Sequence, residues 1–197
     1  MEREIIQGVV FDFDGTITRP FFDFGLIKDE IGMPRDMLII EFLKDKDETF
    51  KRRAEEILNK REEKAAQKAV LNDHIPELLQ FLETKKIKTA VLTRNKRTSV
   101  DTVSKKFNLA FDYIDTRENE PIKPHPEAMK RVISRLQIDP GSILTIGDFE
   151  HDILCGMEAG TKTMFLTNGN NDQKLKFRPD YMVSDMREGL HIIKNLI

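Results

Sequence analysis

The sequence has little of three features that would point to particular partners: cysteine, an excess of one charge, and long apolar runs. Its single cysteine, Cys155, has no second cysteine to pair with, which fits a reducing compartment. The 32 Lys and Arg nearly balance the 34 Asp and Glu, whereas a nucleic-acid surface needs a basic excess. Apolar runs such as residues 37–40 are too short to span a membrane, and the start turns polar too early for a signal peptide. We therefore expect a cytoplasmic protein that binds neither nucleic acid nor a membrane.

What the sequence does contain is an alternation of short β-branched runs with amphipathic helical patterns. The strongest runs are nearly continuous in apolar residues, as expected of strands buried on both faces, and cover residues 5–13, 88–92, 142–146 and 162–166. Weaker strands are expected near residues 113–115 and 181–183. Strands that alternate with helices predict an α/β fold with a doubly wound, Rossmann-like parallel sheet.

One stretch, residues 18–72, breaks this alternation. Residues 41–68 carry nine Lys or Arg and eight Asp or Glu, and their apolar residues recur on one face of a long helix. This pattern predicts a small all-helical cap over residues 18–72, inserted after the first strand into a core of residues 1–17 and 73–197. Arg61 falls on the apolar stripe between Leu58 and Ala65, where it either extends to solvent or faces a ligand.

Polar side chains follow the first two predicted strands, at the sheet edge where open α/β sheets bind ligands. Asp12 and Asp14 come at the end of the first strand, and carboxylates this close repel each other unless a cation or a shared proton stabilises them. Thr93, Arg94 and Asn95 follow the second strand. A hydroxyl at a helix start suits a phosphate oxygen, and it equally suits a helix cap.

Two later segments add charge at the same edge. Lys123 stands in a proline-bracketed segment before a helix, and Asp148 and Asp152 follow the fourth strand, four residues apart. Taken singly, each of these groups fits an ordinary turn, helix cap or surface residue. Taken together, the four acids, the hydroxyl and the lysine predict phosphoryl transfer through an aspartyl phosphate, with Mg2+ as cofactor.

In these segments the chain resembles the haloacid dehalogenase superfamily, on its phosphatase side. The matching residues follow the order of that superfamily's four motifs: Asp12-Phe13-Asp14-Gly15-Thr16, then Thr93, then Lys123, then Gly147-Asp148 with Asp152. The resemblance covers the whole chain, because the insertion stands where family members carry a helical type-1 cap. The segments around Thr93 and Lys123 are similar to the phosphoglycolate-phosphatase-like branch.

The resemblance implies a role for each matching residue. Asp12 would be the nucleophile, Asp14 the general acid and then the general base, and Lys123 the positive charge beside them. Thr93 would hold phosphoryl oxygens together with the backbone amide of Arg94. Substrate contacts are also expected from the side chains of Arg94, Asn95, Lys123 and Arg61.

The implied metal site is an all-oxygen Mg2+ site at the same place. Its expected residues are Asp12 and Asp148 through their carboxylates, Asp14 through its backbone carbonyl, and Asp152, which is expected to orient Lys123 or a bound water more than to bind the metal directly.

The expected reaction is hydrolysis of a phosphate monoester of a small phosphorylated metabolite, by a monomer or weak homodimer. Asp14 disfavours a carbon–halogen hydrolase, because a halide leaving group needs no proton. A phosphomutase of the β-phosphoglucomutase type remains the main alternative, since it uses the same core and a similar cap. A phospho-receiver domain fits less well, because receivers lack a cap, and an idle scaffold fits less well, because every expected functional group is present.

Overall fold

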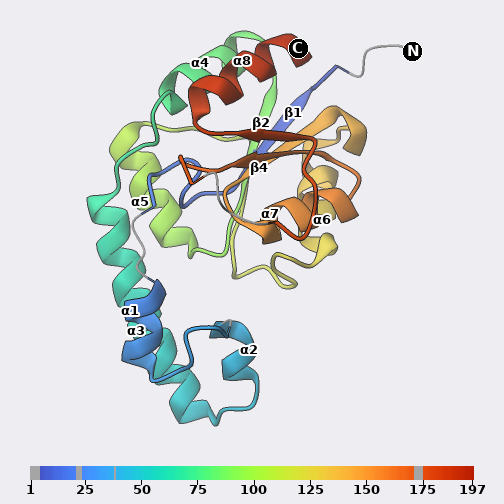
Figure 1. The fold of residues 1–197 in the computed structure, drawn as a ribbon. Helices are drawn as coiled ribbons and strands as arrows, with labels where there is room; N and C mark the ends of the chain where they lie inside the picture. The colour runs from blue at the N-terminus through green and yellow to red at the C-terminus, as the bar shows by residue number, and fades with distance from the viewer. Residues whose placement is uncertain (1–4, 21–23, 38, 171–174) are drawn as a thin grey trace.

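A computed structural model, which describes residues 5–20, 24–37, 39–170 and 175–197, has one sheet of six parallel strands in the order β3-β2-β1-β4-β5-β6 (Figure 1). The strands are β1 (Gly8–Phe11), β2 (Lys88–Leu92), β3 (Tyr113–Asp115), β4 (Ile143–Gly147), β5 (Lys162–Leu166) and β6 (Tyr181–Val183). The α/β class and the parallel sheet are confirmed, although β1 is shorter than the predicted run over residues 5–13.

The centre of the sheet is fully buried, and its strand ends are aligned. β1 lies between β2 and β4, with Phe11 beside Val91 on one side and Ile146 on the other. Val9, Val10 and Phe11 have no exposed surface, which explains their continuous apolar character. Because the three strands are parallel and in register, the residues that follow them meet at one edge of the sheet.

Helices cover both faces of the sheet (Figure 1). One face packs against α4 (Ile75–Thr84), α5 (Arg97–Phe107) and α8 (Met186–Leu196), and the other against α6 (Pro126–Leu136) and α7 (Glu150–Glu158). Alternate residues of β1 serve the two cores, since Val9 belongs to the first and Val10 to the second. No helix within the described ranges is long and apolar enough to cross a membrane.

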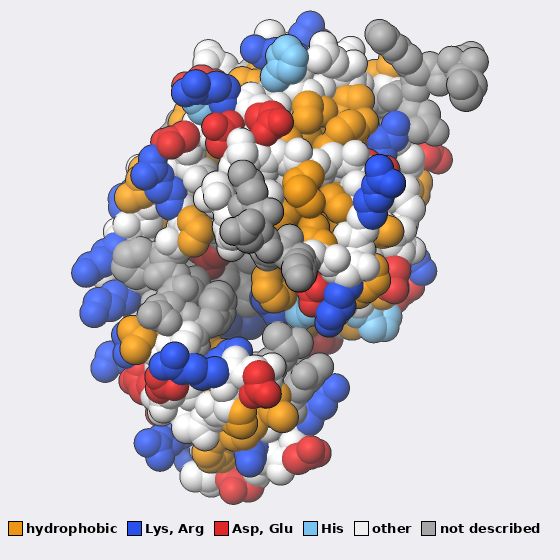
Figure 2. Space-filling view, in the orientation of Figure 1, with side chains coloured by type: hydrophobic (Ala, Val, Ile, Leu, Met, Phe, Trp, Pro, Cys, Tyr) orange, Lys and Arg blue, Asp and Glu red, His pale blue; other side chains and the backbone are white. Residues whose placement is uncertain are grey.

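The insertion after β1 is helical, as predicted. It contains α1 (Phe24–Ile31), α2 (Ile39–Lys44) and α3 (Glu48–Lys68), which form a lobe to one side of the sheet (Figure 1). This lobe has its own small core around Ile27, Ile31, Met33 and Ala54. Figure 2 shows its Lys, Arg, Asp and Glu side chains interspersed over the surface, as expected of a solvated face with mixed charge.

The long helix α3 joins the lobe to the core. Its first half packs inside the lobe, whereas Ala66 lies in the core cluster with Phe13 and Val103. The two connections of the insertion run side by side, since the N–H of Asn72 donates to the carbonyl of Ile17 at 2.9 Å. The domain boundaries at residues 18 and 72 stay a prediction.

A substitution of Leu78 tests the core between the sheet and helices α4, α5 and α8, because Leu78 is fully buried there. Leu78→Ala should lower the free energy of unfolding by about 2–5 kcal/mol, through lost burial and a residual cavity. Denaturant titration measures the change, and Val70→Ala, at a side chain that is 56% exposed, serves as control. An equal effect of the two substitutions would contradict this account of the core.

Candidate active site

The centre of the site is an ion pair between Asp12 and Lys123. Asp12 follows β1 directly, and its backbone N–H donates to the carbonyl of Ile146 at 2.8 Å. The buried ammonium of Lys123 donates to the carboxylates of Asp12 at 2.5 Å and Asp152 at 2.6 Å. Burial acts to lower the pKa of Lys123, but the two carboxylates together raise it above its ordinary value. Lys123 is therefore a permanent positive charge at this edge of the sheet.

Three carboxylates crowd around this charge. Oxygens of Asp12, Asp148 and Asp152 all lie within 4.8 Å of one another. Burial, followed by the charges of its neighbours, raises the pKa of Asp148 to about 8. The pKa of Asp12 rises to about 7, because burial outweighs the lowering effect of Lys123. One lysine does not neutralise three acids, so this cluster could bind a metal, and its carboxylate oxygens suit a hard divalent cation.

Two glycines allow the backbone to approach these acids. Gly15 has a φ of +79°, and a Cβ there would lie 1.9 Å from Oδ2 of Asp148. A Cβ on Gly147 would lie 2.3 Å from the Cβ of Asp152. Both distances are far below van der Waals contact, so the carboxylates occupy the volume that a side chain would need. The glycines beside the two acidic motifs are thus required by the geometry of the cluster.

The carboxylate of Asp14 has different partners from that of Asp12. It accepts hydrogen bonds from Nδ2 of Asn95 at 2.5 Å and from Oγ1 of Thr18 at 3.2 Å. Burial raises its pKa, although both hydrogen bonds act in the opposite direction. Asp14 is therefore poised to hold a proton more readily than an exposed aspartate. Its expected metal contact through the backbone carbonyl stays a prediction.

The segment after β2 forms a tight turn beside the acids. Thr93 is buried, and its hydroxyl accepts a hydrogen bond from the backbone N–H of Asn95 at 3.1 Å. The guanidinium of Arg94 lies 3.4 Å from Nδ1 of His151 and 5.8 Å from the ring centre of Phe149. Burial, and then the charge of Arg94, lowers the pKa of His151. Arg94 is thus placed beside the start of α7, and its predicted role in binding phosphate stays open to test.

In the cap, Arg61 and its neighbour Glu62 face different surroundings. Arg61 pairs with Glu30 of α1 at 2.5 Å, and both side chains are about 40% exposed. Glu62 is buried and forms an ion pair with Arg117, which follows β3. The substrate contact predicted for Arg61 stays a prediction, whereas Glu62 is a contact between cap and core that the sequence reasoning missed.

The loop that carries Lys123 is held by Arg131 of α6, which the sequence reasoning also missed. Arg131 donates to the fully buried carboxylate of Asp115 at 2.6 Å, and to the backbone carbonyls of Asn119 at 2.8 Å and Pro121 at 3.2 Å. One guanidinium therefore ties the end of β3 to the segment that leads into Lys123. The only signal in the sequence is an acid at the end of a short strand, which does not identify its partner.

Comparison with known proteins agrees with this geometry. Residues 26–166 match the family of haloacid dehalogenase-like hydrolases. An uncharacterized hydrolase of Saccharomyces cerevisiae is 31% identical over 97% of this chain and 92% of its own length. The pyrophosphatase PpaX of Bacillus mycoides is 31% identical over 61% of this chain and 58% of its own.

A solved structure supports the fold independently. The structure of a predicted phosphoglycolate phosphatase from Haemophilus somnus superposes with a TM-score of 0.75 at 20% identity, over 98% of this chain and 99% of that one. The parallel sheet, the helices inserted after β1 and the acidic cluster thus occur together with a family match across most of the chain. The chain belongs to the haloacid dehalogenase-like hydrolases and is an enzyme with phosphatase relatives.

Arg131→Met tests the support of the Lys123 loop. The substitution leaves the buried carboxylate of Asp115 without its cation, which should cost about 3–5 kcal/mol of unfolding free energy, and hydrolase activity should fall as Lys123 loses its position. Chemical denaturation and turnover measure the two effects. Lys130→Met, at an exposed pair with Glu127 on the same helix, is the control, and equal results for both variants would argue against the assigned contact.

The raised pKa values predict how a cation stabilises the protein. Without a cation, the pKa values of Asp12 and Asp148 in the folded chain lie above their ordinary value of 3.8. The protonated groups therefore stabilise the fold most below pH 4, and this contribution is lost as the pH rises through 7 and 8. MgCl2 should therefore raise the melting temperature more at pH 8 than at pH 5.5, by roughly 2–4 °C for each kcal/mol gained.

Thermal melts with MgCl2 or with EDTA at the two pH values provide the measurement. Asp148→Asn should reduce the Mg2+-dependent shift at pH 8, because it replaces a carboxylate of the cluster by a neutral amide, which attracts a cation less, and removes one of the repelling charges. A melting temperature that is indifferent to MgCl2 at both pH values would contradict a cation site at this cluster.

Proposed function

We propose that this hydrolase is a Mg2+-dependent phosphatase that acts on phosphate monoesters of small metabolites through an aspartyl phosphate on Asp12. The observation that carries the proposal is the carboxylate of Asp12, 2.5 Å from the buried ammonium of Lys123 and within the acidic cluster. A relative described as a pyrophosphatase and a structural neighbour described as a predicted phosphoglycolate phosphatase support a phosphate-containing substrate.

In the first step, Asp12 attacks the phosphorus atom, and the bond from phosphorus to the ester oxygen breaks. Asp14 donates its proton to the departing oxygen, so the leaving group is released as a neutral alcohol. The burial that raises the pKa of Asp14 supports this role, because the residue must carry a proton when the substrate arrives.

In the second step, Asp14 is ionised and accepts a proton from water as the water attacks the phosphorus of the aspartyl phosphate. The bond between phosphorus and the Asp12 oxygen breaks, which releases inorganic phosphate and restores the carboxylate. The hydrogen bonds from Asn95 and Thr18 hold the carboxylate of Asp14 in one orientation during both proton transfers.

The remaining residues offset the negative charge of the phosphoryl group or bind its oxygens. Lys123 places a positive charge beside Asp12 and the transferred phosphoryl oxygens, and Thr93 with the backbone amide of Arg94 offers hydrogen bonds to those oxygens. Asp12, Asp148 and the backbone carbonyl of Asp14 would hold Mg2+, with Asp152 as an orienting partner. When bound, Mg2+ supplies positive charge that offsets the repulsion between Asp12 and the phosphate.

Asp12→Asn should abolish phosphate release, because an amide is not a nucleophile toward phosphorus, and it should leave the fold intact because it removes one of three crowded charges. Phosphate release from a panel of phosphorylated metabolites with MgCl2 measures activity, and circular dichroism checks the fold. Asp45→Asn, at an exposed position of the cap, is the control. Full activity of Asp12→Asn would overturn the assignment of the nucleophile.

The same panel separates a phosphatase from a phosphomutase. Incubation with a hexose 1-phosphate, followed by phosphorus NMR, should show free phosphate. Formation of the 6-phosphate isomer without release of phosphate would contradict the proposal and favour the mutase.

A further inference from the structure

An ion pair between the buried Glu62 and the partly exposed Arg117 connects the cap to the core beside the proposed catalytic acid. Glu62 on α3 is 5% exposed, and its carboxylate accepts hydrogen bonds from the guanidinium of Arg117 and from the backbone N–H of Lys96 at 3.3 Å. Arg117 also donates to Oδ1 of Asn59 at 2.8 Å. Two residues of the cap helix therefore hold one cation of the core.

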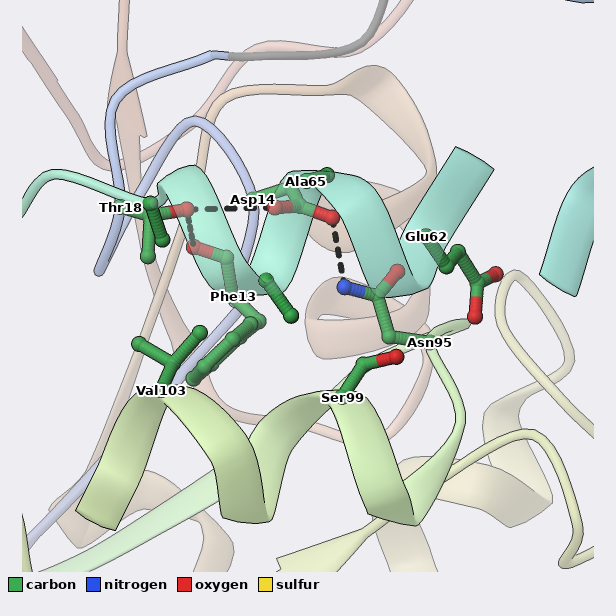
Figure 3. A pocket seen from close by; sticks show the side chains of 10 residues that line it. Phe13, Asp14, Thr18, Glu62, Ala65, Asn95, Ser99 and Val103 are labelled. Carbon is green, nitrogen blue, oxygen red and sulfur yellow. Dashed lines mark hydrogen bonds between the residues drawn. The ribbon is translucent and has the colours of Figure 1, made fainter. Parts of the chain in front are cut away.

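This pair lies on the side of the site where the alcohol would leave. Glu62 lines the same hollow as Asp14 and Asn95, and Figure 3 shows the three side chains following one another along the space between α3 and α5. Glu62 is close enough to Asp14 for the charge of Asp14 to contribute to its raised pKa, after burial as the main cause. Since Asp14 would protonate the departing oxygen, Glu62 and Arg117 would border the leaving group.

The core-facing side of α3 adds negative charge and hydrogen-bond acceptors. Glu55 pairs with Lys96 at 3.8 Å, one turn before Asn59 and two turns before Glu62. Of the basic residues near Glu62 on α3, Arg61 pairs with Glu30 within the cap, and Lys64 is exposed. Two core cations that approach α3, Lys96 and Arg117, are thus already matched by carboxylates of the cap, whereas Lys106 donates to backbone carbonyls at the end of the helix.

We propose that the pair of Glu62 and Arg117 determines substrate specificity, by favouring phosphate esters of neutral, hydroxyl-bearing molecules over substrates with a second anionic group. This inference rests on the proposed phosphatase function. A hydroxyl group can donate to Glu62 or to the amide oxygen of Asn59. A second carboxylate or phosphate would instead meet the charge of Glu62, and it could reach Arg117 only by leaving a buried carboxylate unpaired.

The test compares the kcat/KM for ribose 5-phosphate and glycerol phosphate with that for phosphoglycolate and pyrophosphate, all with MgCl2. The wild-type enzyme should prefer the neutral leaving groups by about tenfold or more. Glu62→Gln should narrow the preference by about tenfold, because Arg117 then keeps only neutral acceptors and its positive charge can attract an anionic substrate. Glu63→Gln, at an exposed neighbour on the same helix, should leave the preference unchanged.

A second variant acts in the opposite direction and does not remove the ion pair of Glu62 and Arg117. Asn59→Asp adds a carboxylate beside Arg117, so it should lower kcat/KM for phosphoglycolate and pyrophosphate more than for the neutral esters. This variant keeps the test valid if Glu62→Gln does not fold, which circular dichroism shows.

The outcomes separate this inference from the proposed function. Hydrolysis of the anionic substrates as fast as the neutral ones by the wild-type enzyme would overturn the inference and leave the phosphatase intact, as would an unchanged preference in both variants. Failure of the wild-type enzyme to release phosphate from any substrate would overturn the proposed function and the inference with it.

Discussion

The site depends on the repulsion between three carboxylates whose oxygens lie within 4.8 Å of one another, with Lys123 paired to two of them, Asp12 and Asp152. Crowding and burial favour the protonated acids, as the raised pKa values of Asp12 and Asp148 show. A chain keeps such a cluster only when stable surroundings fix it. Here the fully buried strands β1 and β4 provide that support, and Gly15 and Gly147 leave the space that the carboxylates fill.

The position of Lys123 shows how the support extends outward from the cluster. Lys123 arises from a loop and not from a strand, so the sheet alone does not fix it. Arg131 binds three parts of the surroundings at once: the buried Asp115 at the end of β3, and the carbonyls of Asn119 and Pro121. A planar guanidinium with several fixed donors suits this task better than an ammonium would. The charge that offsets the acids therefore depends on a second ion pair, between Arg131 and the fully buried Asp115.

The sequence was sufficient to predict the sheet and the acids at its edge, because buried parallel strands have continuous apolar runs and end at one edge. It could not predict which way Asp14 points, since β1 ends at Phe11 and the following turn directs Asp14 toward Asn95. Nor could it predict contacts between distant segments, such as Glu62 with Arg117. A charged residue on a helix looks the same in sequence whether its partner is water or a buried arginine.

The helix α3 packs in two hydrophobic cores of the molecule. Its first half belongs to the small core of the cap, and its second half to the large core through Ala66. Glu62 lies between Leu58, which packs against the cap core, and Ala66, which packs in the large core, so both cores fix its position. The same helix therefore brings a carboxylate to the border of the site. Arg61, one residue earlier, points to Glu30 within the cap. A rotation of this helix that brought Arg61 to the position of Glu62 would exchange an acid for a base beside Asp14, so the helical register of α3 sets the charge that a substrate meets.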